Sequence, residues 1–214
     1  MSAATHDDDA GGGWAGRVMV FLRAGTQVVA VNVLVLLGTL AGGVVLGAYP
    51  ALGAGGGLLA RLVGGSPSEH LWREFWSAYR AGFRRLNLLG APLTAGFVLL
   101  ALDASVLAAA SPGPTKAALT MGVVVLTTYL TVALATLVPV ARRYDDAPVA
   151  RTWRFVAVAP LLWPLTSLAV LAAFVVLAVT FSAVPVLVPL AGASVPLLIS
   201  GWLVDQRLTR LDAV

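Results

Sequence analysis

The sequence predicts an all-α fold, a polytopic bundle of transmembrane helices. Only 11% of its 214 residues are charged and 59% are hydrophobic, whereas soluble domains carry about 25% charged residues. Several uninterrupted apolar stretches reach the length of about 20 residues that a membrane span needs. Prolines and arginine clusters separate these stretches. We therefore expect one transmembrane helical domain over residues 16–214, with about five full spans, one short return helix and one cytoplasmic-side amphipathic helix.

The N-terminal quarter is expected to hold a tail, a full span and the return helix. Residues 1–15 are polar, acidic and glycine-rich, which is typical of a disordered tail. Residues 27–49 form an apolar run that is too long for the core of an ordinary signal peptide, so they are predicted to be the first span. Pro50 is expected to end that helix. Residues 51–63 are apolar but too short for a full span, which favours a return helix.

Residues 69–86 are predicted to form an amphipathic helix. Ser66 and Pro67 suit the start of a helix, and Glu69 can complete a capping box. The aromatic side chains that follow recur at helical spacing on one face, and arginines occupy the opposite face. The aromatic face can lie in the lipid head-group layer or pack against the rest of the bundle. The candidate residues for docking to lipid or to a partner are Trp72, Arg73, Phe75, Trp76, Tyr79, Arg80, Phe83 and Arg84.

The rest of the chain, from residue 87 on, is expected to hold four spans. Residues 155–204 carry no formal charge, and as one helix they would be about 75 Å long. Because that length is more than twice the hydrocarbon thickness of about 30 Å, the segment must fold back. Pro185 and Pro189 mark the expected turn. The four predicted spans are residues 87–110, 117–141, 155–179 and 184–204.

The distribution of basic residues predicts the orientation. Arginines concentrate before the second span, before the fourth span and after the last, whereas the other two loops hold only Lys116. Arginine-rich loops are cytoplasmic in membrane proteins. If residues 51–63 return the chain, both termini are cytoplasmic; the competing arrangement has an external N-terminus. The arginines counted are Arg61, Arg73, Arg80, Arg84 and Arg85, then Arg142, Arg143, Arg151 and Arg154, and finally Arg207 and Arg210.

Composition argues against most kinds of chemistry. The chain has no cysteine, which excludes disulfides, thiolate nucleophiles and cysteine metal sites. Neither His6 nor His70 is expected to have a buried acidic neighbour, so neither a metal site nor a Ser/His/Asp arrangement is expected. We expect no enzymatic activity and no cofactor. The formal charge of +4 fits anionic lipid head groups better than nucleic acid, so the bilayer is the expected partner.

Two polar residues are weak candidates for an intramembrane site. Asn32 lies in the first span, where an interhelical hydrogen bond is favoured over a ligand contact. Asp103 is the one carboxylate predicted within or near the end of a span, and such groups are functional candidates. Its position, eight residues before Ser111, also fits an interfacial or helix-paired role.

Two stretches of the sequence resemble a known family. The first runs from Asn32 through Tyr49-Pro50-Ala51 and Leu71–Trp76 to Phe83-Arg84-Arg85, and the second from Pro139–Arg142 through Tyr144-Asp145 to Trp153-Arg154. Over residues 25–165 the chain resembles the YesL-like family of small integral membrane proteins, domain of unknown function 624. The resemblance implies a prokaryotic origin and association with carbohydrate-uptake systems. It implies no established activity and no catalytic residue.

These observations lead to two functional hypotheses. The first is a non-enzymatic accessory or regulatory component associated with a carbohydrate transport system, which would dock on another membrane transport protein through the helix over 69–86. The alternative is a small transporter or channel in its own right. That alternative needs a polar path, and Asn32, Asp103 and Thr127-Thr128 are the few side chains available to line it. Both hypotheses place the protein in the cell membrane as a multi-pass protein.

Overall fold

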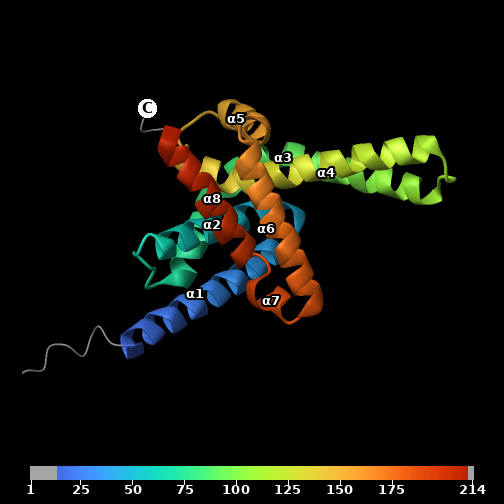
Figure 1. Ribbon diagram of the computed structural model, residues 1–214. Helices are drawn as coiled ribbons and strands as arrows, with labels where there is room; N and C mark the ends of the chain where they lie inside the picture. Colours follow the sequence, from blue (N-terminus) through green and yellow to red (C-terminus); the bar gives the residue numbers. More distant parts are fainter. Residues whose placement is uncertain (1–13, 212–214) are drawn as a thin grey trace, which may run out of the picture.

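The computed structural model describes residues 14–211, and that part of the chain is entirely helical, without strands (Figure 1). The predicted all-α class is confirmed. Residues 1–13 of the predicted tail lie outside the described residues, whereas Trp14 and Ala15 already belong to the first helix. The eight helices of residues 14–211 are α1 Trp14–Ala41, α2 Val45–Val63, α3 Leu71–Ala109, α4 Pro114–Arg143, α5 Val149–Leu162, α6 Pro164–Ala183, α7 Leu187–Ala191 and α8 Ser194–Leu211.

Four of these helices are long and apolar enough to cross a membrane. They are the candidate spans Gly16–Ala41, Leu71–Ala109, Pro114–Arg143 and Pro164–Ala183. In α3 and α6, only 11% of the most apolar window is buried inside the protein, so most of that surface is left for lipid. The chain is therefore a multi-pass membrane protein. The expected total of five full spans differs from these four because residues 184–204 do not form one helix.

The predicted helix break at Pro50 is wrong. The first helix already ends at Ala41, and Pro50 lies inside α2. Gly43 adopts a left-handed backbone conformation with φ of 69°, and its N–H donates to the Leu40 carbonyl while the Val44 N–H donates to the Thr39 carbonyl. These two hydrogen bonds define a Schellman motif, which satisfies carbonyls that the helix end leaves free. A glycine after the helix, and not the proline, therefore sets the end of α1.

Helix α2 runs back along α1, as the return helix was expected to do, but it has 19 residues where 13 were expected. The two helices approach closely because glycines line the contact. A Cβ built on Gly47 would lie 2.3 Å from the Thr39 carbonyl oxygen, and one built on Gly38 would lie 3.1 Å from the Ala51 Cβ. Only residues without a side chain allow backbones this near one another.

The predicted amphipathic helix over 69–86 and the predicted span over 87–110 are one continuous helix. Helix α3 has 39 residues, which corresponds to a length of about 58 Å. It begins at Leu71 and not at the expected capping box, because the Ser68 hydroxyl accepts the His70 N–H at 3.2 Å just before the helix. The helix is about 28 Å longer than the hydrocarbon layer is thick, so a large part of it extends beyond that layer.

The predicted fourth and fifth spans are each divided into two helices. Trp163 separates α5 from α6 because the following Pro164 disfavours a helical conformation at the residue before it. Pro164 has no N–H for the Pro160 carbonyl, and the Ser167 hydroxyl donates to that carbonyl at 3.0 Å instead. The segment over 184–204 forms α7 and the first part of α8.

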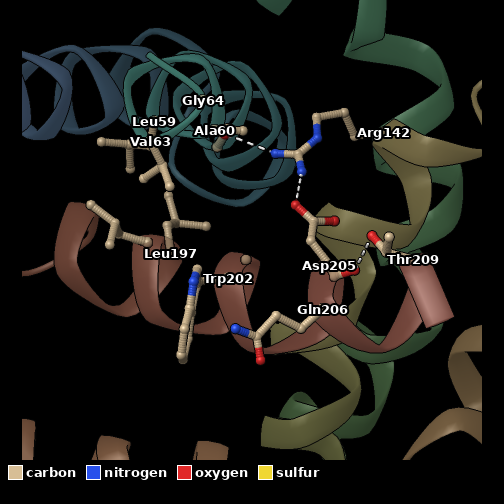
Figure 2. Close-up of a pocket in the computed structure, with 13 residues that line it drawn as sticks. Leu59, Ala60, Val63, Gly64, Arg142, Leu197, Trp202, Asp205, Gln206 and Thr209 are labelled. Carbon is tan, nitrogen blue, oxygen red and sulfur yellow. Dashed lines mark hydrogen bonds and ion pairs between the residues drawn. The ribbon is translucent and has the colours of Figure 1, made fainter.

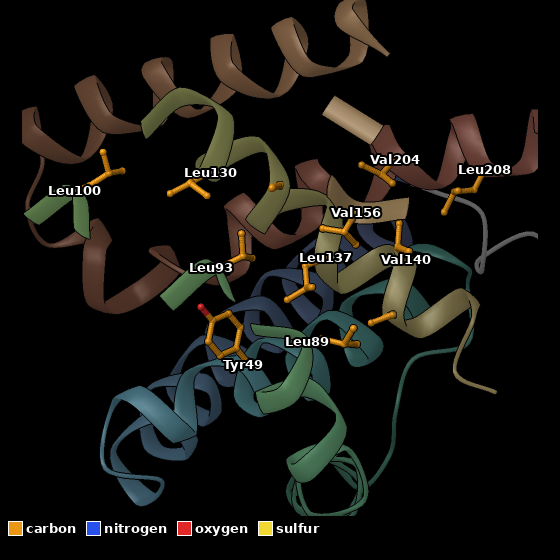
Figure 3. Close-up of a cluster of buried hydrophobic side chains, with 12 residues drawn as sticks. Tyr49, Leu89, Leu93, Leu100, Leu130, Leu137, Val140, Val156, Val204 and Leu208 are labelled. Carbon is orange, nitrogen blue, oxygen red and sulfur yellow. The ribbon is translucent and has the colours of Figure 1, made fainter. Parts of the chain in front are cut away.

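The helices pack around two clusters of buried side chains. One cluster joins α1, α2 and the start of α3 around Val31, Ala51 and Phe75. The other joins α2, α3, α4, α5 and α8 around Leu89 and Leu137 (Figure 3). The outer halves of α3 and α4 form a hairpin that points away from the other helices (Figure 1). Val204 and Leu208 of α8 belong to the second cluster, so α8 packs next to α4 although it lies at the far end of the chain.

Candidate functional site

The aromatic face of α3 packs into the protein's own bundle. Phe75 is fully buried and Tyr79 is 6% exposed. The Tyr79 hydroxyl donates to the Gly38 carbonyl at 3.0 Å. Trp76 and Phe83 are partly buried against the same cluster. Of the two interpretations left open by the sequence, packing against the bundle is the one that the structure shows for Phe75 and Tyr79, whereas Trp76 and Phe83 keep part of their surface exposed.

The exposed candidates are Trp72, at the start of α3, and the arginines on the face opposite the aromatic cluster. We call this surface the α3 stripe and define it by its five members. Their spacing places the three arginines and the serine on one face of the helix. Trp72 is 61% exposed, and the other four members are also exposed. The members of the α3 stripe are Trp72, Arg73, Ser77, Arg80 and Arg84.

The α3 stripe is basic and its charge is not matched locally. Glu74, the acidic residue in the first turn of α3, forms an ion pair with Arg61 of α2 at 2.5 Å. A shallow hollow on the stripe is lined by Trp72, Arg73, Ser77 and Arg80, together with the edge of Trp76. Guanidinium, indole and hydroxyl groups are hydrogen-bond donors, so this surface suits an anionic or acceptor-rich partner.

Arg85 differs from its neighbour Arg84 in that it is a structural residue. Its guanidinium donates to the carbonyls of Ala141 at 2.9 Å, Tyr144 at 2.6 Å and Ala147 at 3.3 Å. These carbonyls lie at the C-terminal end of α4 and in the loop after it. Carbonyls at a helix end lack partners within the helix and carry partial negative charge, so Arg85 holds α3 to the end of α4.

Asn32 is fully buried and all its polar atoms have partners. Its Nδ2 donates to the Pro189 carbonyl at 2.6 Å, and its Oδ1 accepts the N–H groups of Ala193 at 2.8 Å and Ser194 at 3.1 Å. The interhelical hydrogen bond predicted for Asn32 is thereby confirmed, and its partners are α7 and the start of α8. The side-chain amide is therefore engaged by the backbone of the protein's own α7–α8 region.

Asp103 lies away from both buried clusters. It is exposed on the outer half of α3, beside a groove that Leu107 and Leu119 help to line between α3 and α4. Within residues 14–211 its carboxylate has no hydrogen-bond or ion-pair partner. The structure thus brings neither Asn32 nor the α3 stripe close to Asp103, and the three candidates do not form one site.

The structure reveals a further site that the sequence did not predict, which we call the junction pocket. It has a volume of about 640 Å³ and lies where the C-terminal ends of α2 and α4 meet α8 (Figure 2). Arg142 of α4 forms an ion pair with Asp205 of α8 and donates to the Gly56 carbonyl of α2 at 3.0 Å. The sequence places Arg142 among the loop arginines, and Asp205 directly follows the uncharged run over 155–204. The one available signal was an acidic residue directly after a long uncharged run.

Comparison with protein families identifies part of the chain. Residues 28–104 match the family model described as "Protein of unknown function, DUF624". This segment is a DUF624 domain. The predicted resemblance is confirmed, although the match is shorter than the 25–165 expected. No curated protein and no solved structure matches the chain.

The DUF624 domain includes most of the predicted candidates. It extends from α1 through all of α2 into α3, so it contains Asn32, the α3 stripe and Asp103. The junction pocket takes its two charged residues, Arg142 and Asp205, from outside the domain. Since the family description names no activity, a function has to be proposed from the geometry.

Proposed function

We propose that this protein is a non-enzymatic accessory or regulatory component of a membrane transport system, one for carbohydrate uptake. The single observation that carries the proposal is the α3 stripe. It is an exposed basic surface on a helix whose other face is anchored in the core. A rigid helix that presents arginine and tryptophan is suited to recognition, because these residues dominate binding energies at protein interfaces.

The polar groups of the membrane segments support the accessory role over the alternative of a small transporter or channel. Asn32 uses its amide to bond the backbone of α7 and α8. The hydroxyls of Thr127 and Thr128 donate to carbonyls one turn earlier in α4, at 2.7 Å and 2.8 Å. Asp103 lies on the exposed hairpin. These residues are the path-lining candidates of the transporter hypothesis, and each of them has a structural or peripheral position.

The orientation places the stripe on the cytoplasmic side in this proposal. Arginine-rich segments face the cytoplasm, where the leaflet also carries anionic lipids. The stripe would therefore contact anionic head groups as well as a cytoplasmic-side surface of the transport protein. Both termini are cytoplasmic in the same arrangement.

A matched pair of variants tests the proposal. The stripe variant combines Trp72→Ala with Arg73→Gln, Arg80→Gln and Arg84→Gln. The control variant makes the same exchanges at exposed positions elsewhere, Trp14→Ala with Arg17→Gln, Arg23→Gln and Arg151→Gln. Both lose three positive charges and one exposed tryptophan, so general effects of charge are equal. Each full-length protein is purified from native membranes in mild detergent, and the transport proteins that accompany it are quantified.

We expect the stripe variant to recover its transport partner about tenfold less well than the wild type, as when an interface loses a hot spot. The control variant should recover the partner at the wild-type level. Unchanged recovery of every transport protein by the stripe variant would refute the proposal. Solute flux in reconstituted vesicles that is lost on Asp103→Asn would instead favour the transporter.

A further inference from the structure

The junction pocket is a built cavity with two distinct ends. Its wall is formed by apolar side chains of α2 and α8, among them Leu59, Val63 and Leu197, with Trp202 along one side (Figure 2). Its polar end is formed by Gln206, Thr209 and the Arg142–Asp205 ion pair. A cavity with an apolar wall and a few polar groups at one end is the usual form of a small-molecule site.

The α8 side of the pocket has open space at Gly201, where a Cβ would meet no atom within 4 Å. Gly56 and Gly64 line the opposite wall on α2. A Cβ on Gly56 would lie 2.7 Å from the Val138 side chain, so Gly56 allows α2 to approach α4. The volume of about 640 Å³ is in the range of pockets that hold drug-sized molecules.

The charges of the pocket select against a charged ligand. Arg142 and Asp205 are its two charged lining residues, and they are paired with each other. An anionic ligand would be attracted by Arg142 and repelled by Asp205, and a cationic ligand would meet the reverse. A net charge on the ligand therefore brings no electrostatic gain from this pair.

The remaining polar groups at this end have unused hydrogen-bonding capacity. Gln206 and Trp202 are exposed at the mouth of the pocket, and within residues 14–211 neither the side-chain amide of Gln206 nor the indole N–H of Trp202 has a protein partner. The second carboxylate oxygen of Asp205 is buried and also lacks one. The set combines donors with acceptors, which matches hydroxyl groups, because a hydroxyl both donates and accepts.

We propose that the junction pocket binds an uncharged amphiphile, with its hydroxylated head at the Gln206 and Asp205 end and its apolar chain along Leu59, Val63 and Trp202. The proposal is independent of the α3 stripe. A bilayer supplies amphiphiles of this kind, and monoacylglycerol is the simplest probe because its glycerol head is uncharged and carries two free hydroxyls.

Photolabelling of the full-length protein tests the proposal. The protein is reconstituted in phosphatidylcholine nanodiscs with a monoacylglycerol that carries a diazirine in its acyl chain, and labelled residues are identified by mass spectrometry. We expect labelling of residues 197–209 to exceed that of the lipid-exposed surface of α6 around Val175. Unlabelled monoacylglycerol should compete for the pocket about tenfold better than the fatty acid or the alkylamine of equal chain length.

Two variants separate pocket binding from general lipid contact. Gly201→Leu adds a side chain to the pocket lining at a position where the Cβ has open space, so it should abolish labelling at 197–209 and leave labelling of α6 unchanged. Gly122→Leu is the matched control, because its Cβ would also meet nothing within 4 Å and it lies outside the junction pocket. Gln206→Leu keeps the shape and should remove the preference for the uncharged head.

Three results would overturn the proposal. Equal competition by charged and uncharged amphiphiles would show an apolar crevice without head-group selection. Labelling at 197–209 that survives Gly201→Leu would place the probe outside the pocket. Labelling no stronger than that of α6 would show bulk lipid contact alone.

Discussion

At the scale of single residues, the Asn32 side chain takes the place of a backbone hydrogen bond that is missing between α7 and α8. In a continuous helix the Ala193 N–H would donate to the Pro189 carbonyl four residues earlier. Here the Asn32 amide lies between them, donating to the carbonyl and accepting the N–H. Its Oδ1 also accepts the N–H of Ser194, the first residue of α8. One side chain of α1 thus stabilises the break between α7 and α8.

Asn32→Leu is expected to destabilise the protein by about 2–4 kcal/mol, because it leaves several backbone groups without partners away from water. Asn87→Leu is the control, since within residues 14–211 the one partner of the Asn87 amide is the Phe83 carbonyl of its own helix. The control should stay within about 1 kcal/mol of wild type. Thermal unfolding in nanodiscs measures both variants. Equal melting temperatures for the two would contradict the bridging role of Asn32.

Adjacent arginines on α3 are expected to differ sharply in their effects. Arg85→Gln removes donors to carbonyls at the end of α4 and should cost about 2–3 kcal/mol, because hydrogen bonds from charged groups are strong. Arg84→Gln, on the exposed stripe, should change stability by no more than about 0.5 kcal/mol. The same unfolding measurement compares them. A loss of stability for Arg84→Gln as large as that for Arg85→Gln would refute this assignment.

These residues show what the sequence reveals at this scale. An asparagine in an apolar run predicts an interhelical hydrogen bond, because its amide must be satisfied inside the membrane. The sequence does not distinguish Arg84 from Arg85, since both belong to one basic segment. Which of them is structural depends on the end of α4, which lies 56 residues further along the chain.

At the scale of helices, glycines rather than prolines set most boundaries in the first half of the chain. Gly43 and Gly65 both adopt left-handed conformations directly after α1 and α2. In each case the following N–H donates to the carbonyl five residues earlier, from Val44 to Thr39 and from Ser66 to Arg61. Pro50 was expected to break the helix, but a proline removes only one hydrogen bond and α2 continues through it.

Substitution by alanine is expected to have opposite effects on stability at two glycines inside helices. A Cβ on Gly90 would lie 2.4 Å from the Tyr49 ring, so Gly90→Ala should destabilise by about 1–3 kcal/mol through overpacking between α2 and α3. Gly57 has open space at the same atom, and Gly57→Ala should be neutral or stabilising by up to about 1 kcal/mol. Melting temperatures of the two single variants test this contrast. A stabilised Gly90→Ala protein would contradict the close packing of Tyr49 on α3.

At the scale of the whole molecule, hydropathy predicts the class of the fold but not the contacts between distant segments. Low charge and long apolar runs were sufficient to predict a helical membrane protein. The junction pocket combines residues near positions 60, 142 and 205, and no local pattern predicts that these three regions meet. The expectation of a single span over 184–204 was wrong for the same reason. The break between α7 and α8 is stabilised by Asn32, a residue more than 150 positions earlier in the chain.

In the proposed orientation, α3 crosses the membrane with its stripe on the cytoplasmic face. Because the chain has no cysteine, a single introduced cysteine reports the side of the membrane on which it lies. Ser77, in the α3 stripe, and Ser111, after the end of α3, are both exposed, so Ser77→Cys and Ser111→Cys form a matched pair. A membrane-impermeant maleimide should label Ser77→Cys only in inside-out vesicles and Ser111→Cys only on intact cells. Labelling of both from the same side, or of Ser77→Cys on intact cells, would contradict the account.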